Sequence, residues 1–263
     1  MWASRGQLPG AERLAPVGLE ELDAAAALRR RFDTKYLMPR AAAGELLERL
    51  AATHRALEID GRRAFEYRTT YFDTEELATY RDHLQGRRRR LKARVRRYVE
   101  SGDCFFEVKL RGPRSSTVKR RLAQDPALDG TLTPAAAEAL ERWVQGAYGR
   151  SAPGPLAPVL EVDFRRTTLV ALGRGERLTI DVDVSMRTPS GGGSGRLDGG
   201  LALVESKSPR GPALATRDLN LLGARRLDGM SKYCLGVVLA LGGGRGNALL
   251  PVLRHCTAGS AAA

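Results

Sequence analysis

Alternating apolar and charged side chains run through the middle of the chain. In RLKARVRRYV (residues 90–99), a basic residue at every second position alternates with Leu, Ala and Val. Because side chains two apart in a strand point to the same face, this stretch predicts a strand with one basic and one apolar face. The turn sequence ESGD (100–103) predicts a hairpin with CFFEVKLRG (104–112), and STVKRRLA (116–123) predicts a third strand of the same kind.

Other parts of the chain predict further strands and helices. Aromatic, β-branched or alternating segments predict strands at 30–37, 65–74, 156–172, 177–186 and 201–207. Helices are predicted at 40–53, 75–84, 133–149 and 231–241, with a short one near 216–223. The first three follow residues that commonly begin helices, namely Pro39, the pair Asp73 and Thr74, and Thr133.

These elements predict one α+β domain. About eight strands with few helices are typical of an antiparallel eight-stranded sheet or β-barrel with helices packed outside. We expect this domain to cover residues 28–242, between a loosely ordered leader (1–27) and a C-terminal tail (243–263). The glycine-rich segment SGGGSGRLDGG (190–200) predicts a flexible surface connector within it.

Composition indicates the class of ligand and the cellular compartment to expect. The formal net charge of +13 favours anionic partners, although a chain rich in Arg, Ala and Gly also reflects a GC-rich genome, so local placement carries more weight. The three cysteines show no CxxC spacing, which disfavours a disulfide framework. The N-terminus lacks the apolar core of a secretion signal, and no apolar run is long enough to span a bilayer. We therefore expect a cytoplasmic protein.

At least five predicted strands carry one charged face. Two cations about 7 Å apart repel by about 2 kcal/mol at an effective dielectric near 20, and arginine cannot lose its proton. Such a face is stable against bulk water or against a bound anion. If the sheet closes with its apolar face under helices, the charges line the lumen, and that lumen suits a polyphosphate with a divalent metal.

Short segments in a fixed order carry a family resemblance. They are RFDTKYL (31–37), YFDT (71–74), KARVRRY (92–98), EVK (107–109), VKRR (118–121), FRRT (164–167), LTID (178–181), ESK (205–207) and SKY (231–233). In order and spacing they resemble the vacuolar transporter chaperone (VTC) domain. This is the polyphosphate polymerase branch of the triphosphate tunnel metalloenzymes, which are related to the CYTH family. The resemblance extends over residues 30–240, nearly the whole chain.

The resemblance implies a site and its residues. The fold would be an eight-stranded tunnel that binds a triphosphate with Mn²⁺ or Mg²⁺. The implied catalytic cations are Lys35, Arg94, Arg96 and Lys232. The implied phosphate-binding or tunnel-lining cations are Lys92, Lys109, Lys119, Arg121, Arg166 and Lys207. The principal implied metal ligand is Glu205, with Glu107, Asp181 and Glu161 as weaker metal candidates or salt-bridge partners of the cations.

The chain departs from the family pattern at several positions. The CYTH signature ExExK would place acidic residues at 31 and 33, where this chain has Arg31 and Asp33. The missing carboxylate disfavours an adenylate cyclase or thiamine triphosphatase and favours the VTC branch. Phe164 stands where that branch commonly has Tyr. Strand parity also allows only one of Arg165 and Arg166 to face the lumen, unless a bulge intervenes.

Three functions are therefore weighed. The leading hypothesis is a phosphotransferase that moves the γ-phosphate of ATP onto a growing polyphosphate chain, which a membrane-protein partner would receive. A hydrolase of tripolyphosphate or nucleoside triphosphates would use the same residues with water as acceptor. A non-catalytic polyphosphate-binding module would bind without turnover. Nucleic-acid binding by the arginine run at 87–90 is disfavoured, because few aromatic residues nearby could stack on bases.

Overall fold

The computed structural model describes residues 7–25, 32–112, 117–209, 211–244 and 247–260. Contacts divide the chain into two compact units. Unit 1 contains residues 1–66, 164–184 and 197–230, and unit 2 contains residues 67–163, 185–196 and 231–263. Four strands contribute residues to both units: β4 (Phe65–Asp73), β8 (Ala157–Ala171), β9 (Glu176–Arg187) and β10 (Gly193–Leu197).

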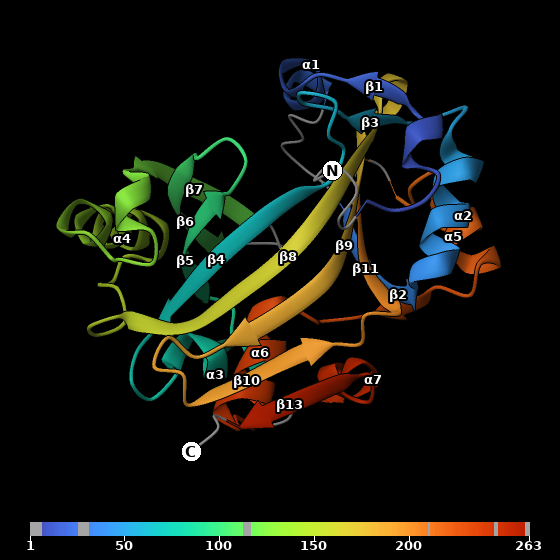
Figure 1. Cartoon of the computed structure of the whole chain (residues 1–263). Helices are drawn as coiled ribbons and strands as arrows, with labels where there is room; N and C mark the ends of the chain where they lie inside the picture. Colours follow the sequence, from blue (N-terminus) through green and yellow to red (C-terminus); the bar gives the residue numbers. More distant parts are fainter. Residues whose placement is uncertain (1–6, 26–31, 113–116, 210, 245–246, 261–263) are drawn as a thin grey trace. The chain divides into compact units, whose positions relative to one another are not determined.

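Unit 1 is an antiparallel sheet with helices on its apolar side (Figure 1). Its strands lie in the order β12 (Arg225–Leu227), β2 (Phe32–Pro39), β11 (Leu201–Ser208) and β9. Side chains of α2 (Arg40–Leu50) and α5 (Thr216–Leu221) join the apolar residues of these strands in one buried cluster. The opposite face of the same strands is left for polar and charged side chains.

The start of the chain adds small elements to unit 1. A 3₁₀ turn, η1 (Ala11–Arg13), contributes Ala11 to the same core, and α1 (Leu19–Ala25) follows. Strand β1 (Ala15–Val17) pairs in parallel with β3 (Arg55–Leu57), which in turn pairs with β8. The described part of the segment expected to be a loose leader therefore contains regular structure. The domain limits at 28 and 242 stay a prediction.

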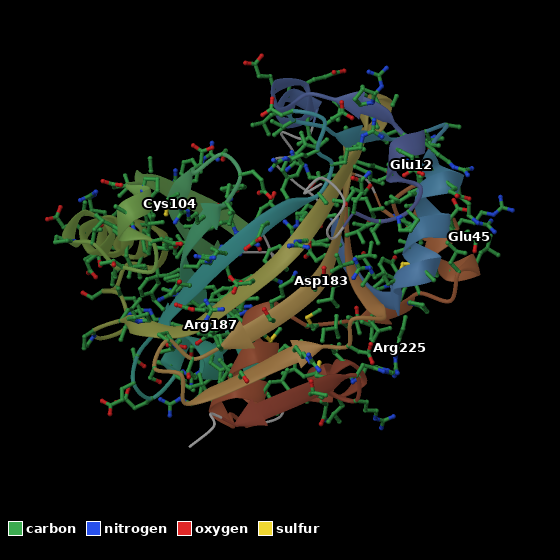
Figure 2. All side chains as sticks on the ribbon, in the orientation of Figure 1. Glu12, Glu45, Cys104, Asp183, Arg187 and Arg225 are labelled. Atoms are coloured by element: carbon green, nitrogen blue, oxygen red, sulfur yellow. The ribbon has the colours of Figure 1, made fainter. Side chains whose placement is uncertain are left out.

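In unit 2, strands β4, β5 (Leu91–Tyr98), β6 (Cys104–Arg111) and β7 (Thr117–Gln124) form an antiparallel meander. Its apolar face packs on α4 (Pro134–Tyr148), as Figure 1 shows, and Cys104 lies on that face (Figure 2). The helix buries a stripe at i, i+4, i+8 and i+12, from Ala136 to Tyr148. Thr133 caps the helix by accepting the N–H of Ala136, as the sequence predicts, and Gly149 ends it with φ at 65°.

The glycine-rich segment at 190–200 differs from its prediction. Its central residues form a strand, β10 (Gly193–Leu197), which pairs with β9 and with β13 (Cys256–Ser260). A Cβ at Gly195 would lie 2.6 Å from the Cβ of Leu239, on α6 (Lys232–Leu241). The expectation of a flexible connector is therefore wrong, because the glycines allow the strand to approach this helix closely.

Most of the predicted elements are confirmed. The fold class is α+β with an antiparallel sheet, and the described residues contain thirteen strands where about eight were expected. The helix expected at 75–84 is shorter, since α3 begins at Ala78 (Ala78–Leu84) after a turn at Leu77. Arg31, in the first family segment, lies outside the described residues. The expected closure into a barrel is not seen among the described residues, because the main path of paired strands runs from β12 to β7 and no pairing joins these two ends. No helix among the described residues is long and apolar enough to cross a membrane.

Candidate functional site

The strand registers in unit 2 place the predicted cations of β5, β6 and β7 on one face. Lys92, Lys109 and Lys119 lie directly opposite one another across the three strands. Arg94 and Arg121 flank Glu107 in the next row. We call the face formed by these rows and by Arg96 the basic face. The other side of the same strands is the apolar core beneath α4.

Glu107 is the one carboxylate that the β5–β7 registers place on the basic face, and it is buried. Its Oε2 accepts from Nε of Arg94 at 2.7 Å and also from Nη2, while Lys119 pairs with Oε1. Burial alone would raise the pKa of Glu107, but Arg94, Arg96 and Lys119 lower it below its usual value. Glu107 therefore acts as an ionised counter-ion that orders the neighbouring cations, and both of its oxygens are engaged.

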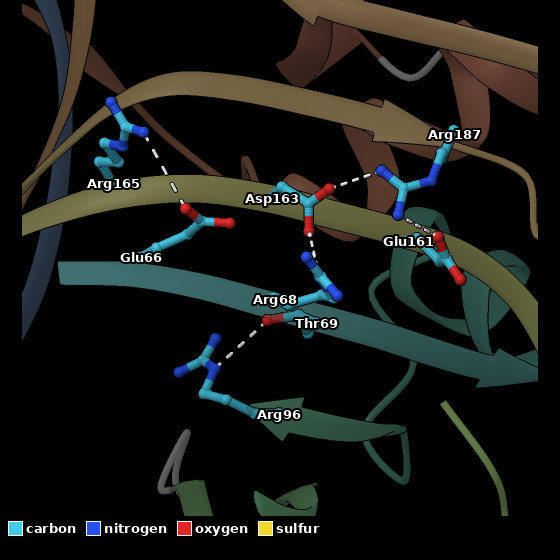
Figure 3. A network of polar contacts seen from close by, with 8 residues as sticks. All are labelled: Glu66, Arg68, Thr69, Arg96, Glu161, Asp163, Arg165 and Arg187. Carbon is cyan, nitrogen blue, oxygen red and sulfur yellow. Dashed lines mark hydrogen bonds and ion pairs between the residues drawn. The ribbon is translucent and has the colours of Figure 1, made fainter. Parts of the chain in front are cut away.

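Arg96 and Lys92 have distinct surroundings at the two ends of the basic face. Arg96 is buried, lies over the ring of Tyr67 at 5.4 Å, and its Nε donates to Thr69 Oγ1 at 3.3 Å (Figure 3). Lys92 Nζ donates to Ser231 Oγ at 2.9 Å and lies 3.2 Å from His83 Nε2. Because Ser231 is the N-cap of α6, Lys92 ties β5 to the start of this helix.

Lys232 follows the N-cap as the first residue of α6 and is partly buried. Its position depends on Ser231, whose hydroxyl accepts from the N–H of Cys234 at 3.2 Å as well as from Lys92. Two predicted site cations, Lys92 and Lys232, are thus brought to the same end of one helix.

Asp73, which the sequence predicts only as a helix cap, is a buried carboxylate that joins several elements of this region. Asp73 is fully buried and accepts from the N–H groups of Thr74 and Thr79 at 2.8 Å and of Tyr80 at 2.9 Å. It also accepts from the hydroxyls of Thr79 and Tyr233. It therefore joins the start of α3 to the first turn of α6, where Tyr233 follows Lys232. The family segments YFDT and SKY contain Asp73 and Tyr233, so the signal was present in the sequence.

Unit 1 carries a second charged cluster. The registers of β2, β11 and β9 place Lys35, Glu205 and Thr179 opposite one another. Lys207 lies two residues beyond Glu205 on β11 and therefore on the same face. Lys207 Nζ lies 3.0 Å from Glu205 Oε2. Burial lowers the pKa of Lys207, Arg166 lowers it further, and Glu205 opposes both. Among the described residues, Lys35 is half-buried and no side-chain ion pair engages it.

Arg166 resolves the ambiguity of strand parity in β8. Its Nε and Nη2 bind the two oxygens of the buried Asp181 at 2.6 and 2.8 Å, and its guanidinium lies 5.1 Å from the ring of Phe164. Arg165 instead approaches Glu66 at 4.0 Å (Figure 3). Arg166 therefore belongs to the cluster of unit 1, with Asp181 as its bidentate partner.

Glu161 belongs to a separate ion-pair network in unit 2. Figure 3 shows Arg187 between Glu161 and Asp163, each at 2.6 Å, with Arg68 3.6 Å from Asp163. The salt-bridge alternative for Glu161 thus has direct geometric support.

The carboxylates differ in their fitness for a divalent metal. Both oxygens of Glu107 and of Asp181 contact cationic side chains. The side chain of Glu205 is more accessible, at 19 % exposed, and its Oε2 lies 3.0 Å from Lys207 Nζ. Across the described residues no three His, Cys, Asp or Glu side chains gather as a metal-binding group. This donor set fits Mg²⁺ or Mn²⁺ only if one carboxylate shares the ion with substrate phosphates, which is the usual arrangement for Mg²⁺.

The VTC domain model matches residues 30–241, so the chain belongs to the VTC domain family. No curated protein sequence matches the chain. Among solved structures, it is similar to a putative adenylyl cyclase from Hippeastrum, reported with dominant triphosphatase activity (17% identity, TM-score 0.46, 78% of this chain and 94% of that one). It is also similar to a putative adenylate cyclase from Vibrio parahaemolyticus (13% identity, TM-score 0.46, 78% of this chain and 97% of that one). A third similar structure is a putative adenylate cyclase from Bacillus halodurans (12% identity, TM-score 0.41, 73% of this chain and 88% of that one).

Proposed function

We propose that this protein is a metal-dependent phosphotransferase that moves the γ-phosphate of ATP onto the end of a polyphosphate chain. The observation that carries the proposal is the row of Lys92, Lys109 and Lys119, directly opposite one another on three adjacent strands. Like charges in this arrangement destabilise a sheet unless an anion binds to them. Polyphosphate and the triphosphate of ATP both supply closely spaced negative charges along a line.

The proposed reaction requires no covalent intermediate with the protein. A terminal phosphate oxygen of the chain attacks the γ-phosphorus, the bond from that phosphorus to the β–γ bridging oxygen breaks, and ADP leaves. The chain gains one phosphate, and the attacking oxygen is already an anion, so no general base is required. Positioning and charge stabilisation carry most of such a transfer.

The basic face would supply both effects. Arginine stays protonated throughout, so Arg94 and Arg96 keep donating charge-assisted hydrogen bonds as charge moves between phosphates. Glu107 holds Arg94 and Lys119 in place before phosphate arrives. Lys35, Arg166, Lys207 and Lys232 are proposed as further phosphate ligands. Glu205 would hold the divalent ion, which when bound neutralises phosphate oxygens.

The test is product analysis with purified protein, radiolabelled ATP, and Mn²⁺ or Mg²⁺. Long-chain polyphosphate is expected. Release of orthophosphate alone would indicate the hydrolase, and binding without turnover would indicate the binding module. Glu205→Ala and Lys232→Ala should each lower the rate by about 100-fold or more, whereas Glu138→Ala, which removes an exposed carboxylate of α4, should not. Parent-rate synthesis by either site variant would refute the assignment of these residues.

A further inference from the structure

The basic face continues past the last row within the β5–β6 ladder. The N–H of Arg111, the last residue of β6, donates to the carbonyl of Arg90 at 3.0 Å. Arg90 and Arg111 therefore stand opposite each other, one residue beyond Leu91 and Leu110. By the period of the strands they belong to the face of Lys92 and Lys109, about 7 Å further along.

The loop that contains Arg90 is fixed by the end of α4. Tyr148 Oη donates to the carbonyl of Arg90 at 2.6 Å, and Nη2 of Arg150 donates to the carbonyl of Arg89 at 3.1 Å. Arg150 also lies 5.9 Å from the ring centre of Tyr148. These contacts place Arg150 beside the loop of residues 87–90, and we call the six arginines of this region the arginine cluster. Its members are Arg87, Arg88, Arg89, Arg90, Arg111 and Arg150.

The arginine cluster has little counter-charge. In the part of the chain that the structure describes, Asp82 is the one carboxylate that forms an ion pair with it, at 3.2 Å from Arg87. Burial lowers the pKa of Arg90, and Arg111 lowers it further. Arg88 and Arg89 are exposed to solvent. Six arginines near one another with one paired carboxylate favour an anionic ligand with more than one charge.

We propose that the arginine cluster is a docking site for the distal phosphates of a linear polyphosphate chain whose end lies on the basic face. This inference rests on the proposed function, because it takes polyphosphate as the ligand. The rows from Arg96 to Arg90 extend over six residues of strand, about 20 Å, so a triphosphate on the rows of Arg94 and Lys92 would not reach the loop arginines. A long chain would reach them.

Chain length is therefore the discriminating variable. We expect Arg88→Ser/Arg89→Ser to bind long-chain polyphosphate about tenfold more weakly than the parent protein, with unchanged affinity for tripolyphosphate. The dependence of long-chain affinity on salt should also become shallower, with a log–log slope reduced by about one to two. Arg13→Ser/Arg142→Ser removes the same charge at two exposed positions elsewhere and should change neither affinity. Arg88→Lys/Arg89→Lys should recover most of the long-chain binding.

Three results would overturn the inference. The first is an Arg88→Ser/Arg89→Ser variant whose affinity for long chains equals that of the parent protein, or falls by no more than the affinity of the control variant falls. The second is an equal loss for tripolyphosphate, which would mean that the loop supports the strands instead. The third concerns a single-stranded oligonucleotide of matched charge. It would bind the parent protein as tightly as polyphosphate does, and its affinity would fall by the same factor in the Arg88→Ser/Arg89→Ser variant. Binding is measured without ATP, so a protein that makes no polymer but shows the length-dependent loss would refute the proposed function alone.

Discussion

Glu107→Gln removes the one negative charge on the basic face while keeping the shape of the side chain. Glu107 is 1 % exposed, and Arg94 and Lys119 both contact it. Loss of one partner from a buried ion pair costs about 3–5 kcal/mol, because the other charge stays buried without compensation. Since glutamine keeps an oxygen that accepts from Arg94, we expect a loss near the lower end, about 3 kcal/mol.

Urea unfolding at neutral pH measures this loss. A change of about 3 kcal/mol should lower the urea midpoint by about 1 M. Glu138→Gln is the matched control, because Glu138 pairs with Arg142 at 3.6 Å on the surface of α4 with both side chains exposed. Its loss should stay below about 0.5 kcal/mol. Equal small losses in the two variants would refute the claim that Arg94 needs a buried counter-ion.

Two further measurements separate the electrostatic cause from a packing defect. Tripolyphosphate should stabilise Glu107→Gln more than the parent, since phosphate then supplies the missing negative charge, and saturation at about 100 times Kd adds about 2.7 kcal/mol. The lowered pKa of Glu107 gives the pH dependence its sign: its stabilisation is complete above the ordinary value of 4.5 and is lost as pH falls below it. The difference between parent and variant should therefore shrink under acid conditions.

Two other predictions concern stability. Gly236→Ala should cost about 1–3 kcal/mol, because the new Cβ would lie 2.4 Å from Leu160. Gly146→Ala, in the exposed face of α4 with no atom within 4 Å, should stabilise by about 0.5–1 kcal/mol, and thermal unfolding compares the two. The pKa of the buried His54 is lowered by burial from 6.5 to about 4, so the unfolded chain binds its proton first as the pH falls. Stability should drop by up to about 3 kcal/mol between those pH values, and a parallel drop in His54→Gln would contradict this account.

Sequence periodicity predicts which residues of a long strand share a face. Alternate residues point to the same side in every register that keeps the apolar side buried. The alternation in residues 90–99 thus places Arg94 and Arg96 on one side, whatever strand lies beside them. Predicting which residue of the neighbouring strand lies opposite each side chain also requires the register. The pairing of Arg94 with Glu107 follows from the register, which the length of the ESGD turn sets, so it could have been derived from the sequence with an assumed turn type.

Other features have no local signal of this kind. Strands of three residues, such as β1 and β3, are too short to show a period. Strand β10 reads as a linker because its glycines have no side chain to alternate, and only its contacts with α6 explain them. Asp73 is predicted as a helix cap, and it does accept from the first turn of α3. Its bond to Tyr233, 160 residues further on, depends on tertiary structure.

The charged face of unit 2 and the charged face of unit 1 differ in their balance of charge. The strands β5, β6 and β7 present seven cations and one carboxylate on the basic face. In unit 1, the paired residues of β2, β11 and β9 present three cations and three carboxylates on the charged face. An excess of positive charge favours polyanions, and a balanced face can hold a metal ion without repelling it. Each face therefore suits a different ligand by its own charge: the basic face of unit 2 suits a polyanion, and the charged face of unit 1, which includes Glu205, suits a metal ion.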